Sequence, residues 1–277
     1  MKGGSRPDAL GGEQVEGHHA VHELLAAGRR ATHRVWVAGA HATSEPMSPL
    51  VRLAHDRGVQ VLFKTADELT QVARTGAPQG VIAWADPVVP VLLGSLIVPG
   101  SPGRPHFFLV LDGVTDPGNF GSLLRSAACA GVGGVVVAHH RSAALTPAAV
   151  KAAAGAVEHV PISLVPGIPA ALQQLTKAGI WSVGLDPVGK EDLWRTTLLD
   201  GPVALVLGSE GRGLSHLVRQ RCDLLARIPQ SGPLASLNVA AAAAVACFEV
   251  ARQRFGMQQP GMQEPGMQQP GMQQPGM

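Results

Sequence analysis

The chain is poor in cysteine, and its cysteines form no pattern. The three in its 277 residues stand far apart and include no CxxC pair: Cys129, Cys222 and Cys247. This spacing offers no disulfide framework and predicts a protein of a reducing compartment.

Long hydrophobic runs are also lacking. The most apolar stretch, residues 88–98, has 11 residues and contains Pro90 and Gly94, whereas a membrane span needs about 20. The first residues, MKGGSRPDAL, lack the apolar region of a secretory signal. We therefore expect a soluble, cytoplasmic protein with no membrane partner.

Charge is low and nearly balanced. Charged residues make up 15% of the chain, and 22 Lys and Arg against 20 Asp and Glu give a net charge of +2. This excludes a polybasic tail as the main means of holding nucleic acid but not a local basic face. Hydrophobic residues, at 45%, are enough for a sizeable core.

Composition divides the chain into five segments. Residues 1–14 are polar and Gly-rich, and residues 256–277 repeat a PGMQQ unit that cannot bury a core, so we expect both to be flexible. Residues 15–85 alternate helical and strand patterns and predict a small α/β domain. Residues 86–106, with five prolines and three glycines, are typical of a linker. Residues 107–255 predict a second α/β domain.

Regular patterns predict the elements of both domains. In the first, helices are expected at 19–27, 49–57 and 67–74, and strands at 33–38, 59–63 and 80–84. In the second, four apolar runs without alternation predict strands buried on both faces of a parallel sheet, at 107–111, 134–138, 181–184 and 203–207. Helices are expected at 121–130, 147–153, 168–178 and 238–254.

Two polar side chains follow the first of these buried strands. Asn119 lies in a Gly/Pro/Asn turn, and Arg125 lies about one and a half turns into an apolar helix. Burying an arginine without a partner is costly. Two interpretations stay open: Arg125 pairs with an internal carboxylate such as Glu210, or it faces a phosphate or a reacting hydroxyl.

Two more glycine-bearing loops follow buried strands. In LVLGSEGRGLS, residues 205–215, three glycines bracket Glu210 and permit close approach of the backbone to a ligand. In residues 227–254 a short apolar strand leads through a Gly/Pro loop to Ser236 and Asn238, which are also common helix caps.

These loops predict one cofactor site, because ligands of open α/β sheets bind at the carboxyl ends of the strands. Its polar groups are Asn119, Arg125, Glu210, Ser236 and Asn238. The GVGG run at 131–134 follows a helix and precedes a strand, the reverse of the dinucleotide fingerprint, so a nicotinamide dehydrogenase is disfavoured.

The three loop segments together resemble the three motifs of the SpoU family of RNA ribose 2′-O-methyltransferases, in the SPOUT superfamily. N-x-G-x-x-x-R is present as Asn119, Gly121 and Arg125, L-G-x-E-G-x-G as residues 207–213, and the I-P and S-L-N-V elements as residues 228–229 and 236–239. GHHAVHELL and PQGVIA, near residues 17 and 78, are similar to the small N-terminal domain of family members that methylate a guanosine of 23S rRNA.

The resemblance implies a fold and a function. The fold is a small, ribosomal-protein-like α/β RNA-binding domain followed by a SPOUT domain with a parallel sheet and a C-terminal trefoil knot. The function is S-adenosylmethionine-dependent 2′-O-methylation of a 23S rRNA guanosine by a homodimer, with no metal. Catalytic positions would be Arg125, Asn119, Glu210, Ser236 and Asn238, and cofactor-binding positions Leu207, Gly208, Gly213, Ile228 and Leu237.

The role of Arg125 follows from its chemistry. A guanidinium stays protonated and is a poor general base, so stabilising a phosphate or an oxyanion is the milder role. RNA affinity is expected from arginines of the small domain, with Arg29, Arg30 and Arg34 as candidates. Three positions depart from the family pattern: Ser209 stands where Asn is frequent, Ala240 where Ser is usual, and Pro78 where His is usual.

Three alternatives remain beside this interpretation. The same chemistry could act on tRNA or on an rRNA site that confers antibiotic resistance. A non-catalytic RNA-binding or assembly protein could keep the fold, although intact motif residues argue against it. The histidine cluster at His18, His19 and His22 could bind zinc, but no cysteine or fourth ligand lies nearby.

Overall fold

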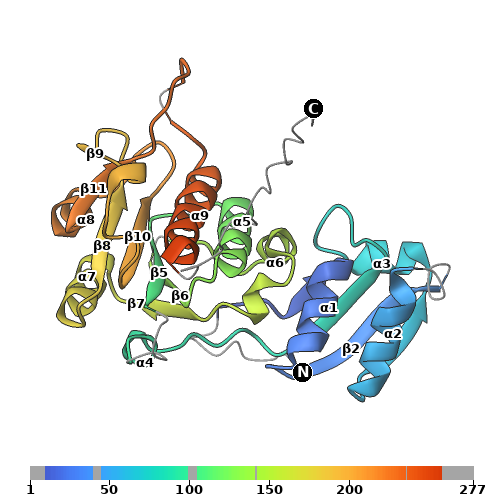
Figure 1. Cartoon of the computed structure of the whole chain (residues 1–277). Coiled ribbons are helices and arrows are strands. Elements are labelled where there is room, and N and C mark those ends of the chain that lie inside the picture. The colour runs from blue at the N-terminus through green and yellow to red at the C-terminus, as the bar shows by residue number, and fades with distance from the viewer. Residues whose placement is uncertain (1–9, 40–44, 99–104, 141, 235, 258–277) are drawn as a thin grey trace, which may run out of the picture.

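The chain forms two α/β units that lie side by side (Figure 1). A computed structural model describes residues 10–39, 45–98, 105–140, 142–234 and 236–257. The repeat tail expected to be flexible lies outside these ranges, apart from Gly256 and Met257 at the end of helix α9. Among the described helices, none has both the length and the apolarity needed to cross a membrane.

The first unit is a four-stranded sheet with helices on both faces. The strand order is β1-β4-β2-β3, with β2 and β3 parallel and the other pairs antiparallel. The strands are β1 (Gln14–Glu16), β2 (Thr32–Ala38), β3 (Gln60–Lys64) and β4 (Val81–Ala85). The helices are α1 (His18–Ala27), α2 (Met47–Asp56) and α3 (Ala66–Val72).

Alternation along β2 sorts its side chains between the two faces of this sheet. Val35 and Val37 are fully buried in the core with α1 and α2, whereas Trp36 packs on the opposite face near Leu69 of α3. The strand predicted at 33–38 is thereby confirmed. The sequence missed β1, because three residues are too few to show a period.

The second unit is a seven-stranded parallel sheet flanked by helices. The strand order is β7-β6-β5-β10-β8-β11-β9. The strands are β5 (Phe107–Asp112), β6 (Gly134–Ala138), β7 (Ile162–Val165), β8 (Trp181–Leu185), β9 (Glu191–Asp192), β10 (Val203–Gly208) and β11 (Leu224–Arg227). The helices are α4 (Leu93–Leu96), α5 (Pro117–Cys129), α6 (Pro147–Ala153), α7 (Ile168–Lys177), α8 (His216–Arg221) and α9 (Val239–Met257), with 3-10 turns η2 (Ala156–Glu158) and η3 (Leu193–Arg195).

The predicted parallel sheet is confirmed, and its central strands β5, β6 and β10 are buried on both faces. Leu109 and Leu205 belong to the core beneath α5 and α9, while Val110 and Val206 belong to the core beneath α7 and α8. Because both faces are covered, the strands need apolar residues at every position, which explains their unbroken runs.

Helix α5 begins earlier than the sequence indicated. Asp116 caps it, its side chain accepting a hydrogen bond of 2.7 Å from the backbone N–H of Asn119, and Pro117 occupies the first turn. Asn119 therefore lies within the helix and not in the preceding turn. Gly121 lies where α5 crosses α6, and a Cβ there would collide with the backbone of Ala149. This motif glycine thus serves helix packing.

A nearly buried ion pair joins the two units. Arg30 Nη2 lies 2.6 Å from Glu158 Oε1, and the side chains are 8% and 2% exposed. Arg30 Nη1 also donates to the carbonyls of Gly12 and Asp86. One guanidinium thus connects the segments before β1 and after β4 to η2 of the second unit.

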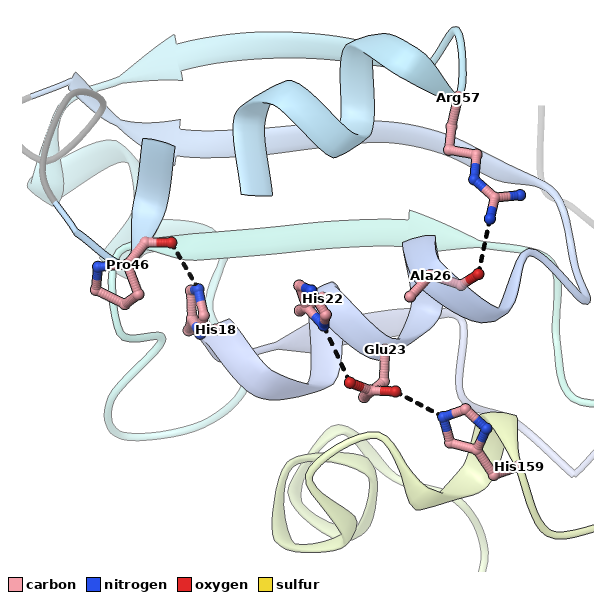
Figure 2. A network of polar contacts seen from close by, with 7 residues as sticks. All are labelled: His18, His22, Glu23, Ala26, Pro46, Arg57 and His159. Carbon is pink, nitrogen blue, oxygen red and sulfur yellow. Dashed lines mark hydrogen bonds and ion pairs between the residues drawn. The ribbon is translucent and has the colours of Figure 1, made fainter. Parts of the chain in front are cut away.

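Figure 2 shows a second set of contacts at this interface. The Glu23 carboxylate lies 2.6 Å from His159 Nε2, across the interface, and 3.0 Å from His22 Nδ1. The hydrogen bond to His159 lowers the pKa of Glu23 below its usual value. Its charged form therefore stabilises the fold above the ordinary carboxyl pKa, and this contribution is lost as pH falls through the lowered value.

The histidines of α1 make contacts within the protein. His18 Nε2 lies 2.8 Å from the carbonyl of Pro46 (Figure 2), and His22 contacts Glu23. Within the described ranges, no three potential ligands of the types His, Cys, Asp or Glu are grouped around a point that a metal could occupy.

The N-terminal segment that was expected to be flexible and the expected linker both make ordered backbone contacts. Leu10 N donates to Val88 O, and Leu145 N of the second unit donates to Leu10 O. Val91 N donates to Ile162 O, so part of the expected linker also lies against the second unit. These backbone bonds depend on chain segments far apart in sequence, which local composition does not reveal.

We predict that Glu158→Gln lowers the free energy of unfolding by about 3–5 kcal/mol, because it leaves the buried Arg30 charge without its partner. Urea unfolding followed by tryptophan fluorescence measures the loss. The control is Arg195→Gln, which removes an ion pair of 3.9 Å whose arginine is 83% exposed and should cost no more than about 1 kcal/mol. Equal effects of the two variants would contradict a structural role for the buried pair.

Candidate functional site

Four loops meet at the carboxyl edge of the large sheet. They follow β5, β8, β10 and β11, and because these strands are parallel their carboxyl ends lie together. The sequence predicted the loops after β5, β10 and β11. The structure adds the loop after β8.

The loop after β10 is a tight, closed turn. Ser209 N donates to Gly213 O at 3.1 Å, and Gly213 N donates to Ser209 O at 2.9 Å. A Cβ on Gly208 would collide with the backbone of Gly213, and Gly211 has a φ of 78°. Glycine is therefore required for close approach at 208 and for the left-handed conformation at 211. The turn presents Glu210 at its tip.

Glu210 is held by two asparagines from other loops. Its Oε1 accepts hydrogen bonds from Asn119 Nδ2 at 2.8 Å and from Asn238 Nδ2 at 2.7 Å. Asn238 Nδ2 also lies 3.0 Å from Asn119 Oδ1. The first turn of α5, the β10 loop and the start of α9 thus meet in one polar cluster, which we call the Glu210 cluster.

Asn238 combines the two roles that the sequence left open. Its Oδ1 accepts from the backbone N–H of Ala240 at 2.9 Å and of Ala241 at 3.3 Å, which caps α9. Its Nδ2 donates to Glu210 Oε1 at the same time. The cap therefore fixes the orientation in which the amide meets Glu210.

A cavity of about 630 Å³ opens beside this cluster. All five residues expected to bind the cofactor line it: Leu207, Gly208, Gly213, Ile228 and Leu237. Glu210, Ser236 and Asn238 line it too. Its size suits a nucleoside-sized ligand, and its wall combines apolar side chains with exposed backbone of glycines.

The sequence analysis missed residues of the β8 loop. Asp186 lines the cavity, is 3% exposed in its side chain and forms an ion pair of 2.7 Å with Arg219 of α8. Its Oδ1 accepts from Val188 N at 3.0 Å, which shapes the loop. The signal was available, because Asp186 directly follows the apolar strand β8.

Arg125 does not join the Glu210 cluster. It lies six residues beyond Asn119, a rotation of about 240° around the helix, and its side chain is exposed. The interpretation that it pairs with Glu210 inside the protein is wrong, since Glu210 binds the two asparagine amides. Arg125 instead lines a second cavity, of about 440 Å³, between the two units.

The three arginines expected to bind RNA have different surroundings. The expectation that Arg30 contacts RNA is corrected, because its guanidinium is buried against Glu158. Arg29 is exposed and donates at 3.4 Å to the carbonyl of His159. Arg34 is exposed and lies 4.6 Å from the ring centre of Trp84.

Arg34 belongs to an aromatic and cationic group on the small sheet. Trp36 and Trp84 pack edge to face with ring centres 5.1 Å apart. Lys64 Nζ lies 5.0 Å from the centre of the Trp36 ring, and Arg34 lies over both rings. We call these four residues the tryptophan platform.

Comparison with known proteins gives consistent matches over both units. Residues 106–248 match the model of the SpoU rRNA Methylase family, and residues 14–90 match that of RNA 2′-O ribose methyltransferase substrate binding. A 23S rRNA (guanosine-2′-O-)-methyltransferase of Pseudomonas aeruginosa is 38% identical over 250 residues, which are 87% of this chain and 97% of that protein.

One further relative and one solved structure are also similar to this chain. An uncharacterized tRNA/rRNA methyltransferase of Mycolicibacterium vanbaalenii is 36% identical, over 87% of this chain and 77% of the relative. The crystal structure of the SpoU methyltransferase AviRb of Streptomyces viridochromogenes in complex with AdoMet has a TM-score of 0.70 and 28% identity, covering 87% of this chain and 90% of that chain.

We predict that Leu237→Ala weakens S-adenosylmethionine binding about tenfold, because Leu237 lines the cavity with a side chain that a bound cofactor would cover, and full burial of a leucine side chain contributes about 1.5–3 kcal/mol. Isothermal titration calorimetry measures the affinity. Leu217→Ala is the matched control, since Leu217 is 48% exposed, close to the 42% of Leu237, and does not line the cavity. An unchanged affinity in Leu237→Ala would place the cofactor elsewhere.

Proposed function

Because the chain belongs to the SpoU rRNA methylase family and is an RNA ribose 2′-O-methyltransferase, we propose that its substrate is a guanosine of 23S rRNA. The cofactor is S-adenosylmethionine. The 23S guanosine is supported by the name of the Pseudomonas aeruginosa relative and by a match that spans both units. Ribosomal RNA as substrate also supports a cytoplasmic location.

The observation that carries this proposal is the cavity beside the Glu210 cluster. When bound, the cofactor supplies a methyl group already activated on sulfonium. The glycine turn at 208–213 and the apolar side chains of Ile228 and Leu237 form a wall that fits such a ligand. The cluster holds its polar groups at the cavity rim, where an acceptor ribose would be oriented against the donor.

The acceptor hydroxyl needs stabilisation as its proton leaves. Glu210, anchored by Asn119 and Asn238, is a hydrogen-bond acceptor at the rim, and Ser236 is a further polar group there. Arg125 would stabilise the phosphate or the developing oxyanion and not accept the proton, since a guanidinium stays charged.

A homodimer is part of the proposal. Val245 and Phe248 of α9 lie one helical turn apart and are 37% and 51% exposed, and Leu234 is 77% exposed. Val245 and Phe248 share one face of α9, and an exposed apolar face of this kind is typical of a contact surface. A second copy could also present its Arg125 to the Glu210 cluster.

The finer fold predictions are also retained as proposals. The C-terminal trefoil knot is supported by the strand order, in which β11 lies beyond β8 while α9 returns to pack with α5. The domain boundaries 15–85 and 107–255, and the RNA-binding role of the first domain, are supported by the extents of the two family matches.

We expect the purified protein to transfer radiolabelled methyl from S-adenosylmethionine to an unmodified 23S rRNA transcript, with label recovered as 2′-O-methylguanosine. Arg125→Ala should reduce the rate at least about 100-fold, as for loss of an oxyanion-stabilising donor, and Arg221→Ala is the control. Label in tRNA only would overturn the rRNA assignment. Absence of transfer to either RNA, with no cofactor binding, would leave a non-catalytic RNA-binding protein.

The tryptophan platform is the proposed RNA-binding surface of the first domain. Its rings hold two cations in place, and Arg34 is available at the surface for a phosphate. We predict that Arg34→Gln weakens RNA binding severalfold and lowers the slope of log affinity against log salt by about 0.7–0.9. Filter binding at several salt concentrations measures both values. Arg52→Gln, an equal change on an exposed residue of α2, should alter neither; a matching effect would refute the platform.

A further inference from the structure

The second cavity lies between the two domains and contains the family's motif arginine. Its lining comes from the start of α1 and the loop before β4 in the first domain, and from α5 and α6 in the second. These elements lie near one another in Figure 1. Its polar lining includes His19 and Gln79 from the first domain and Arg125 and Lys151 from the second. Its volume of about 440 Å³ is enough for one nucleotide.

The walls of this cavity are firmly held. Glu16, fully buried, accepts hydrogen bonds from the backbone N–H groups of Arg74 at 2.6 Å and Thr75 at 3.1 Å. Lys151 of α6 donates to Ala77 O and, at 3.3 Å, to Thr75 Oγ1. The loop that forms one wall is therefore tied to both domains, and the cavity keeps its shape if the domains stay together.

The charge of the cavity favours an anion. Arg125 and Lys151 are cationic, and among the described residues Arg125 makes no ion pair. The one carboxylate in the lining, Glu16, is occupied by the donors named above and by Gln14. A phosphate entering the cavity would meet two cations and no competing free carboxylate.

Gln79, which also lines the cavity, is held in an uncommon conformation. Its φ is 54°, in the left-handed region that side chains other than glycine rarely adopt. Its Oε1 lies so close to Gly17 that a Cβ there would approach it to 2.9 Å. Strain of this kind persists where the surroundings enforce it, often at a binding site.

We propose that this cavity, the interdomain groove, holds the nucleotide next to the methylated one. Arg125 and Lys151 contact its phosphate, and the Gln79 amide contacts its base edge. The inference rests on the proposed function, because the RNA that reaches Arg125 must enter the groove that contains it. Lys151 and Gln79 are positioning residues, and the ligand is single-stranded RNA, whose bases are free for such contacts.

Two variants test the groove without disturbing the core. Ala148→Glu adds a negative charge at an exposed position of the lining, in the first turn of α6, where a carboxylate suits a helix. Its matched control is Ala178→Glu, an equal change on an exposed residue after α7, outside the lining. Gln79→Gly removes the amide while relieving the positive φ, and Gln79→Asn restores an amide in a residue that tolerates it.

Binding of a fluorescein-labelled 23S rRNA transcript and methyl transfer are measured for each variant. Ala148→Glu and Gln79→Gly should each raise the Kd and the KM for RNA about five- to tenfold, with kcat and the Kd for S-adenosylmethionine within twofold of wild type. Ala178→Glu should match wild type, and Gln79→Asn should recover part of the loss.

Failure of the groove and failure of the proposed function give different results. If wild type methylates the RNA but Ala148→Glu and Gln79→Gly bind it as Ala178→Glu does, the groove is not the binding site and the proposal is overturned. If wild type binds RNA without methylating it, the enzymatic proposal fails. The Kd values of the variants then still show whether RNA binds in the groove. If wild type binds no RNA, both are overturned.

Discussion

The buried pair of Arg30 and Glu158 is the constraint on which the two-domain arrangement depends. Each charge is tolerated in the interior only because the other is present, so any arrangement of the two domains that buries one charge without the other is strongly disfavoured. Glu23 and His159 reinforce the same interface nearer the surface (Figure 2). This fixed orientation determines where Gln79 of the small domain faces Arg125 of the large one.

Within the large domain, the corresponding constraint is the meeting of three loops at Glu210. Each loop is shaped locally, by the Asp116 cap of α5, by close packing at Gly208 and by the Asn238 cap of α9. Local shape alone would leave three independent turns. The amide hydrogen bonds from Asn119 and Asn238 join them into the rim of one cavity, which is why the motif residues are found together despite wide separation in sequence.

The sequence predicted the features that depend on a local pattern and missed those that depend on contacts between residues far apart in the chain. The resemblance to the SpoU family supplied Gly208 and Leu237 of the cavity lining. Unbroken apolar runs predicted the central parallel strands, and the loops after them predicted Glu210, Ser236 and Asn238 as polar groups of the same cavity. The same reasoning assigned Arg30 to RNA, because nothing near it in sequence reveals Glu158, 128 residues away. Asp186 was missed although it follows a buried strand, since no glycine-rich loop accompanies it.

Arg125 shows how helix geometry separates two parts of one motif. Asn119 and Arg125 share α5, yet their spacing turns them to different faces, one toward the Glu210 cluster and the other into the interdomain groove. No change of side-chain rotamer reverses a difference set by the backbone. A reaction that needs both residues at one ribose therefore needs the Arg125 of a second copy of the chain beside the Glu210 cluster of the first. A homodimer satisfies this requirement, and it would make the groove of one copy the route by which RNA reaches the cavity of the other.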